Sequence, residues 1–161
     1  MLDAIRDLYA HQSWADALQW TVVTGSADTR ESEEMKDRLV HLHGAQWIWL
    51  ARWKGEKASF PSLGQFATLE ELRTFARDIH RNLARFLAGL DEHALAAAVS
   101  YTDIKGNPHA QPLGGLMLHL ALHSQYHRGQ NASLMKRLGH PAPPTDFVQW
   151  MRAGKPQAYW P

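Results

Sequence analysis

Apolar side chains recur at helical spacing in four long stretches of this 161-residue chain. Spacings of three and four residues place such side chains on one face of a helix, and that face must be covered by other helices. The stretches cover residues 2–23, 31–54, 68–90 and 113–138. Because no internal repeat or low-complexity tract competes with this pattern, it predicts an all-α fold: a four-helix bundle that forms one domain over residues 1–161.

Capping and turn residues mark the ends of these helices. Gly25 is placed to end the first one. Thr68 and Glu71 form a capping-box signature at the start of the third, in which each side chain serves a backbone N–H group. Pro112 opens the fourth helix and Gly139 closes it, since proline suits a helix start and glycine suits the residue after a helix end. These signals agree with the apolar spacing.

The connections between the helices are predicted to differ in length. Residues 26–30 form a short polar link, and residues 55–67, which contain glycine and proline, form a loop. A helical turn at residues 94–99, then an extended stretch at residues 99–104 and a turn, lead to the fourth helix. A short last helix or tail is expected, with helix at residues 145–151.

Two histidines, His123 and His127, lie on the apolar face of the fourth helix. At ~100° per residue, both fall within roughly 40° of Leu116, as do three further leucines of that helix. A buried polar group needs a partner, and two neutral imidazoles on adjacent turns share a metal ion more readily than they satisfy each other. A structural pair bonded to backbone or water is the alternative. The pattern favours a metal ion held among the helices.

The second helix offers a third ligand, since His41 and His43 both lie on it. They are ~200° apart around the helix, so at most one of them can face the pair. The apolar face has His43 at its edge and His41 on the other flank, so periodicity favours His43. His119, one turn before His123, is a candidate fourth ligand; with three protein ligands alone, a position stays open for water or substrate. The other histidines are interpreted as ordinary side chains: His11, His80, His93, His109 and His140.

Composition narrows the chemistry and the partners. The chain has no cysteine, so it offers neither a thiolate ligand nor a thiol nucleophile, and a metal must rest on histidine and carboxylate. With 17 basic and 16 acidic side chains the formal charge is +1, which gives no general field for binding nucleic acid or an anionic membrane. No apolar run approaches the ~18 residues that span a bilayer, and the amino terminus has the pattern of an amphipathic helix rather than a signal sequence. A cytoplasmic protein is expected.

The second and fourth helices carry the most specific segments of the chain, HLHGAQWIWLAR at residues 41–52 and HLALHSQYHRGQ at residues 119–130. These segments resemble the DinB-like, or YfiT-like, metalloprotein family. The likeness extends over nearly the whole chain and includes Trp-Ala-Asp at residues 14–16, where the family often has asparagine in the last place. The resemblance implies a four-helix bundle of up-down-down-up order that binds nickel, zinc or a similar divalent ion through three histidines.

The resemblance also implies which histidines bind the ion: His41, His123 and His127, with His43 as the fallback. One departure concerns Gln46, where the family often has glutamate, because glutamine can hydrogen-bond but cannot act as a carboxylate base. Arg128 and Gln130 also match the family motif. Each of them has two alternative roles: contact with a substrate, or helix capping or interface packing. The chain has neither H-E-x-x-H nor Glu-x-x-His, so zincin and ferritin-like di-iron sites lack their usual ligands.

The expected activity is that of a metal-dependent enzyme acting on a small molecule. In a hydrolytic version, metal-bound water attacks a polarised bond; in a transferase version, resembling the thiol-dependent branch of the family, the metal holds the thiolate of a low-molecular-weight cosubstrate. The alternative is a non-catalytic, stress-associated interaction module with a structural ion. The tryptophan-rich second helix suggests a partner surface, and the resemblance implies a homodimer through paired helices. Residues 60–66 and 101–112 are expected to frame the pocket.

Overall fold

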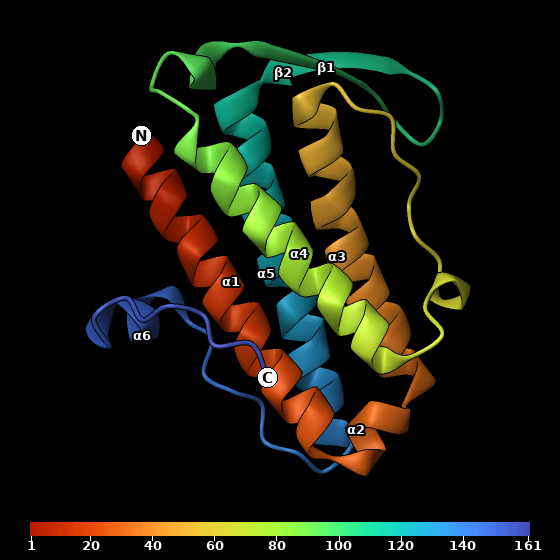
Figure 1. The fold of residues 1–161 in the computed structure, drawn as a ribbon. Coiled ribbons are helices and arrows are strands. Elements are labelled where there is room, and N and C mark those ends of the chain that lie inside the picture. The colour runs from red at the N-terminus through yellow and green to blue at the C-terminus, as the bar shows by residue number, and fades with distance from the viewer.

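The computed structural model describes all 161 residues and is mainly helical (Figure 1). Its six α-helices are α1 (Leu2–Gly25), α2 (Ala27–Glu31), α3 (Glu33–Lys54), α4 (Leu69–Ala88), α5 (Leu113–Arg137) and α6 (Phe147–Arg152). Two short 3-10 turns, at Leu63–Gln65 and Ala94–Ala96, and two strands, β1 (Ala98–Thr102) and β2 (Pro108–Pro112), complete the fold. The four long helices coincide with the four predicted stretches, so the prediction of a mainly helical protein is confirmed.

The four long helices lie alongside one another (Figure 1). Helix α1 packs against α4 and α5, and α3 packs against the same two helices. In Figure 1, α1 and α5 run downwards while α3 and α4 run upwards, and the β1–β2 hairpin crosses the upper end. The contact between α3 and α5 therefore lies on the opposite side from the contact between α1 and α4.

Capping side chains and a glycine set the helix ends. The hydroxyl of Thr68 accepts a hydrogen bond from the backbone N–H of Glu71 (3.1 Å), so α4 starts where the capping signature predicts. Ser32 accepts in the same way from the N–H of Met35 (3.2 Å) at the start of α3. Gly139 follows α5 with φ of +83°, a left-handed backbone that glycine adopts without strain.

The link between α1 and α3 differs from its prediction. Residues 27–30, predicted as part of a polar link, form the short helix α2 together with Glu31, which was predicted to begin the second long helix. The buried hydroxyl of Thr29 donates to the backbone carbonyl of Val23 (3.1 Å) in the last turn of α1. This contact, which no local sequence pattern announces, ties α2 to the end of α1.

The segment before α5 also differs in part. The extended stretch predicted at residues 99–104 is confirmed for residues 99–102, which belong to β1, while residues 103–104 lie in the turn. Strand β2 was not predicted, because its two terminal prolines and lack of apolar alternation hide it. The two strands pair antiparallel around a turn held by Asp103, whose carboxylate accepts from the backbone N–H groups of Lys105 (2.8 Å) and Asn107 (2.9 Å). A small hairpin therefore stands beside the helices.

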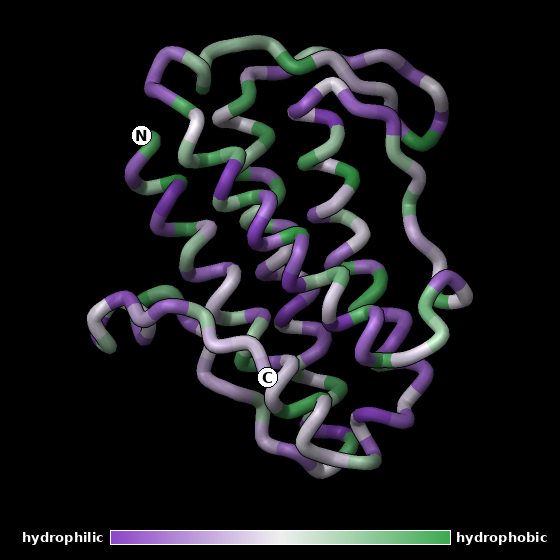
Figure 2. The backbone as a smooth tube through the Cα atoms, viewed as in Figure 1, coloured by the Kyte–Doolittle hydropathy of each residue, from purple (hydrophilic) through white to green (hydrophobic).

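The interior consists of two apolar clusters with a polar layer between them. The cluster near the hairpin includes Ile5, Leu50, Leu83 and Leu120, and the cluster at the other end includes Trp20, Leu39, Leu72 and Leu134. The polar layer, at the middle of the long helices, contains Asp16, Gln19, His43, Gln46, His80, Ser124, Arg128 and Asn131, all buried. Hydrophobic and hydrophilic positions alternate along each long helix (Figure 2). None of the helices is both long and apolar enough to cross a membrane.

Candidate metal centre

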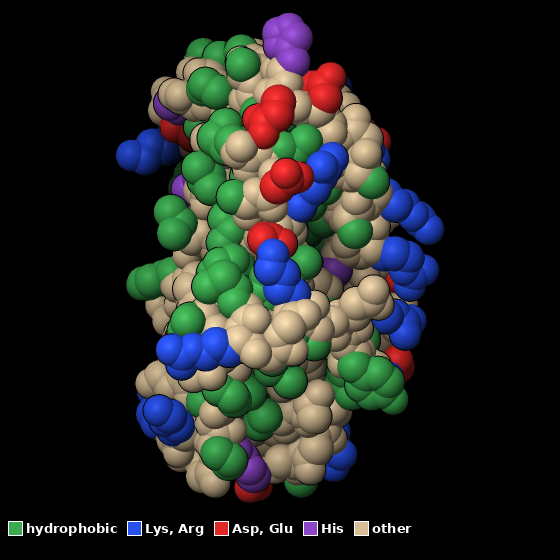
Figure 3. All heavy atoms as spheres, turned by 90° about the vertical axis from the view of Figure 1, so that its left-hand side faces the viewer, with side chains coloured by type: hydrophobic (Ala, Val, Ile, Leu, Met, Phe, Trp, Pro, Cys, Tyr) green, Lys and Arg blue, Asp and Glu red, His purple; other side chains and the backbone are tan.

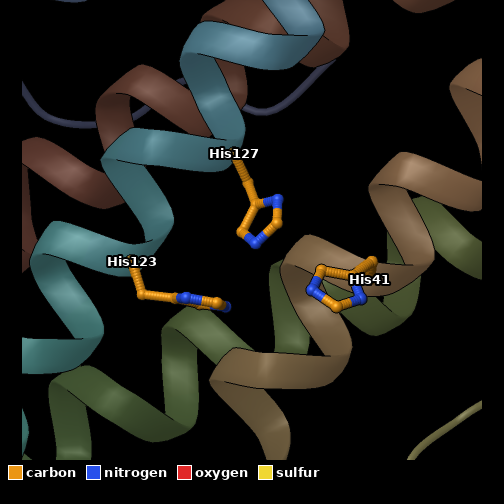
Figure 4. A group of neighbouring side chains, drawn as sticks. All are labelled: His41, His123 and His127. Atoms are coloured by element: carbon orange, nitrogen blue, oxygen red, sulfur yellow. The ribbon is translucent and has the colours of Figure 1, made fainter.

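Three histidines from α3 and α5 face one another (Figure 4). One ring nitrogen from each of His41, His123 and His127 lies within 4.8 Å of the other two. The ring centre of His127 is 4.4 Å from that of His41 and 4.4 Å from that of His123. Nitrogens that share a tetrahedral ion with bonds of ~2.1 Å stand about 3.4 Å apart. Small side-chain rotations would therefore bring all three onto one ion.

The burial of these histidines corrects the prediction from periodicity. His123 and His127 are half-buried at the edge of the α5 contact face, so the prediction that they point inward is wrong. The inward positions beside them belong to Ser124, Arg128 and Asn131, which are buried. Apolar periodicity overlooks these residues because they are polar. The histidines consequently border solvent, where a bound ion would be accessible.

Position 41, and not position 43, joins the pair on α5. His41 is exposed at the α3–α5 contact, as the resemblance implies and periodicity does not. His43 points into the polar layer, where its Nε2 accepts from the indole N–H of Trp20 (3.0 Å) and its Nδ1 donates to the side-chain oxygen of Gln46 (2.9 Å). Burial lowers the pKa of His43 to about 4, which keeps it neutral. The fallback ligand lies outside the group.

Hydrogen bonding and burial prepare the ring nitrogens on α5 for a cation. The Nδ1 of His127 donates to the side-chain oxygen of Gln130 (2.9 Å), which leaves Nε2 with a free lone pair. Burial, followed by the neighbouring histidines, lowers the pKa of His123 to about 4. Burial and His41 lower the pKa of His127 as well. Neutral imidazole is the form that binds metals. Gln130 thus has an orienting contact that sequence analysis left undecided.

Aromatic side chains surround the three histidines. The ring of Phe60, from the loop between α3 and α4, lies 5.5 Å from that of His41, and Tyr126 lies 5.2 Å from His127. Gly44 permits this approach, because a Cβ there would lie 2.8 Å from the Phe60 ring. The expectation that the loop at residues 60–66 frames the site therefore holds for Phe60.

The other expected neighbours lie further out. His119 stacks on His123 with ring centres 5.8 Å apart and packs edge-on against Trp49 at 5.3 Å, but it is not part of the three-histidine group. In the hairpin, Tyr101 also packs against Trp49, at 5.0 Å. The candidate fourth ligand is thus a neighbour of the group.

A second group with ligand spacing lies in the polar layer: Asp16, His43 and His80. One carboxylate oxygen of Asp16 accepts from His80 Nε2 (2.8 Å) and from the amide of Gln46 (2.8 Å), and the other accepts from Arg128 Nη1 (3.0 Å). Burial alone would raise the pKa of Asp16, but Arg128 and His80 outweigh it and hold that pKa well below its usual range. The carboxylate is ionised, and protein donors already surround it.

The sequence pattern did not reveal the role of this layer. His80 was interpreted as an ordinary side chain, and Arg128 as a cap, an interface residue or a substrate contact; both instead bind the buried Asp16. Gln46 belongs to the same network and faces away from the three-histidine group. A detectable signal was present, because Asp16 and His80 occupy buried positions on otherwise apolar helix faces.

The model of the DinB family matches residues 1–158. No curated protein matches the chain significantly.

Proposed function

We propose that this chain, which belongs to the DinB family, binds one divalent ion through His41, His123 and His127. The observation that carries the proposal is the convergence of three imidazole nitrogens from two helices within 4.8 Å of one another. Family membership supports a metal-binding protein of the DinB type. Three nitrogen donors and no thiolate suit zinc or nickel better than a hard cation such as magnesium.

The proposed activity is metal-dependent chemistry on a small molecule. When bound, the ion would polarise a substrate or lower the pKa of a water or thiol ligand. Three protein ligands would leave positions open, and the exposure of His41 supports a site that is open to solvent. Gln130 holds the ring of His127, while Phe60 and Tyr126 supply apolar walls on two sides.

Both reaction types proposed from the sequence fit these residues. Gln46 is engaged in the polar layer and cannot serve as a base, so a hydrolase would take its nucleophile from solvent at the ion. A thiol-dependent S-transferase would bind a low-molecular-weight thiol, because the chain has no cysteine. The absence of a cysteine thiol is compatible with both.

We also propose a homodimer. On α5, Leu118, Leu122 and Tyr126 follow one another at intervals of four residues and are exposed, at 38%, 72% and 64%. Such a row supports pairing of α5 with a partner helix beside the metal site. The same row supports the alternative function, a non-catalytic, stress-associated interaction module with a structural ion.

The architecture we propose is a single domain over residues 1–161 in which α1, α3, α4 and α5 form an up-down-down-up four-helix bundle. The helix directions in Figure 1 and the four pairwise helix contacts support this arrangement.

The test of the proposed site is metal content. We expect protein purified without added metal, then incubated with zinc or nickel and desalted, to hold about one ion per chain by elemental analysis. The double variant His123→Ala, His127→Ala should hold none, while His93→Ala, an exposed histidine outside the group, serves as the matched control. Equal metal content in the wild type and the double variant would overturn the proposal.

The loaded protein then separates the two functions. One or more exchangeable waters on the ion, together with turnover in a screen of ester, amide and small-thiol substrates, would support the enzyme. A fourth protein ligand and no exchangeable water would support the interaction module.

A further inference from the structure

A second candidate site lies on the opposite side of the long helices. A cavity of about 670 Å³ opens between α1, α4 and the chain segment that follows α6. Figure 3 looks onto the face formed by α1 and that segment, where a hollow lies beside charged side chains of both signs. Sites for small organic ligands typically occupy about 300–1,000 Å³. The cavity is therefore large enough for a small organic molecule.

One part of the cavity wall is apolar. Leu83 and Leu87 of α4 and Tyr9 of α1 lie on its inner side, and Trp160 of the C-terminal segment lies on its outer side. The Trp160 ring is 5.2 Å from the ring of His80, which also lines the cavity. This wall suits the hydrocarbon body of a ligand.

Another part of the wall carries cationic side chains. Arg6, Arg77, Arg81 and Lys155 line the cavity, and no aspartate or glutamate does. Asp16, which is bound by His80, is also bound by Arg128, and three further acids, Asp3, Asp7 and Asp78, each pair with one of the lining cations. Of the four lining cations, Arg77 has no such partner. The lining therefore favours an anion.

The two lining arginines on α4 differ in their contacts within the protein. Arg77 makes no hydrogen bond or ion pair within the protein. Arg81 pairs with Asp78 (2.8 Å), an exposed i,i+3 contact of the kind that contributes little and exchanges readily. Arg77 and Arg81 are one helical turn apart, so two guanidinium groups can reach one carboxylate.

The lining cations outside α4, Arg6 and Lys155, make more contacts within the protein. Lys155 pairs with Asp7 (2.6 Å), and Arg6 pairs with Asp3 (3.3 Å) and donates to the carbonyl of Leu90 (3.1 Å). The anion is therefore expected on the α4 side, with its apolar body directed toward Leu87 and Trp160.

We propose that this cavity binds an organic carboxylate with an apolar body, with the carboxylate on Arg77 and Arg81 and the hydrocarbon against Leu83, Leu87 and Trp160. Bidentate hydrogen bonds from the guanidinium groups fix the position of the carboxylate. Burial of the hydrocarbon supplies most of the affinity. The site is separate from the three-histidine group and does not depend on it.

The test is calorimetric titration of the metal-free full chain with octanoate and with 2-naphthoate. Metal-free protein is used because a carboxylate can also bind a metal ion. We expect saturable binding of at least one of the two, and no binding of propionate or octylammonium. The double variant Arg77→Gln, Arg81→Gln should weaken binding at least about tenfold. Ala84→Trp, which places an indole in the cavity from an exposed helical position, should abolish it.

Two controls separate this site from others. Arg85→Gln, on the same helix but outside the lining, should bind like the wild type, as should His123→Ala, His127→Ala. Thermal unfolding of each variant verifies folding. The proposal is overturned if neither carboxylate binds at millimolar concentration, if octylammonium binds equally well, or if folded Arg77→Gln, Arg81→Gln and Ala84→Trp variants bind like the wild type.

Discussion

Two groups of side chains in this protein have the spacing of metal ligands, yet only one of them is suited to a metal. In the outer group, the imidazole rings of His41 and His123 make no hydrogen bonds. The ring of His127 makes one, from Nδ1 to Gln130. In the inner group, the Asp16 carboxylate already accepts three hydrogen bonds, one of them from an arginine. Proximity of donors is shared by both groups. The outer group differs from the inner one because its ligand nitrogens are free of protein partners and are accessible from solvent.

The largest expected effect comes from breaking the inner group. Asp16→Ala leaves the Arg128 guanidinium buried without its partner, so we expect the free energy of unfolding to fall by about 3–5 kcal/mol. Urea unfolding followed by circular dichroism measures the loss. Asp3→Ala, which removes an exposed partner of Arg6, is the control and should change stability little. Similar small losses in both variants would mean that the polar layer does not support the fold.

The next effect concerns the outer group. Zinc or nickel at 100 times its dissociation constant should stabilise the wild type by about 2.7 kcal/mol, because the ion binds the folded state. Addition of a chelator should reverse the gain. In His123→Ala, His127→Ala the thermal midpoint should not respond to metal. A response of the same size in this variant would move the metal to another site, with the inner group the first to examine.

A smaller effect is expected from the residue that orients His127. Gln130→Ala removes the acceptor for His127 Nδ1 and should weaken zinc binding about tenfold, since supporting contacts of this kind typically contribute factors of 10–100. Competition with a chromophoric chelator measures the affinity. Ser133→Ala, at an exposed position on the same helix, is the control. Unchanged affinity in Gln130→Ala would show that the ring is oriented by packing alone.

The smallest effect is one of pH and belongs to the inner group. The Asp16 pKa is depressed in the folded protein, so its contribution is present above the unfolded value of about 3.9 and is lost as pH falls further. Between pH 5 and about pH 3.5 only the beginning of this loss is sampled. The stability gap between wild type and Asp16→Asn should therefore narrow over this range in urea titrations. A constant gap would indicate that the pKa of Asp16 is the same in the folded and unfolded protein, and a gap that shifts toward the wild type as the pH falls would indicate that Asp16 is protonated in the fold.

The same contrast explains what the sequence could predict. Helix positions followed from apolar spacing, and the start of α4 followed from Thr68, because both signals are local. The orientation of α5 was misjudged, since Ser124 and Arg128 turn inward to meet partners on other helices, and no local pattern contains those partners. The placement of His41 came from resemblance, where periodicity favoured His43.

The hairpin and the buried polar network could not be predicted from local sequence patterns, for the same reason. Strand β2 exists because it pairs with β1 around the Asp103 turn, and Asp16 is tolerated because helices α3, α4 and α5 each bring it a donor. Long-range pairing determines both features. A polar residue on an apolar helix face is the one hint that a sequence supplies.

The polar layer has a consequence for the lifetime of an ion at the outer group. Hydrogen bonds among Asp16, Gln46 and Arg128 connect α1, α3 and α5. The helices that carry His41 and the α5 histidines are therefore held together without a metal ion. Loading and unloading then require no opening of the chain. The residence time of an ion at the proposed site would then be governed by ligand exchange at its coordination sphere and not by unfolding of the chain.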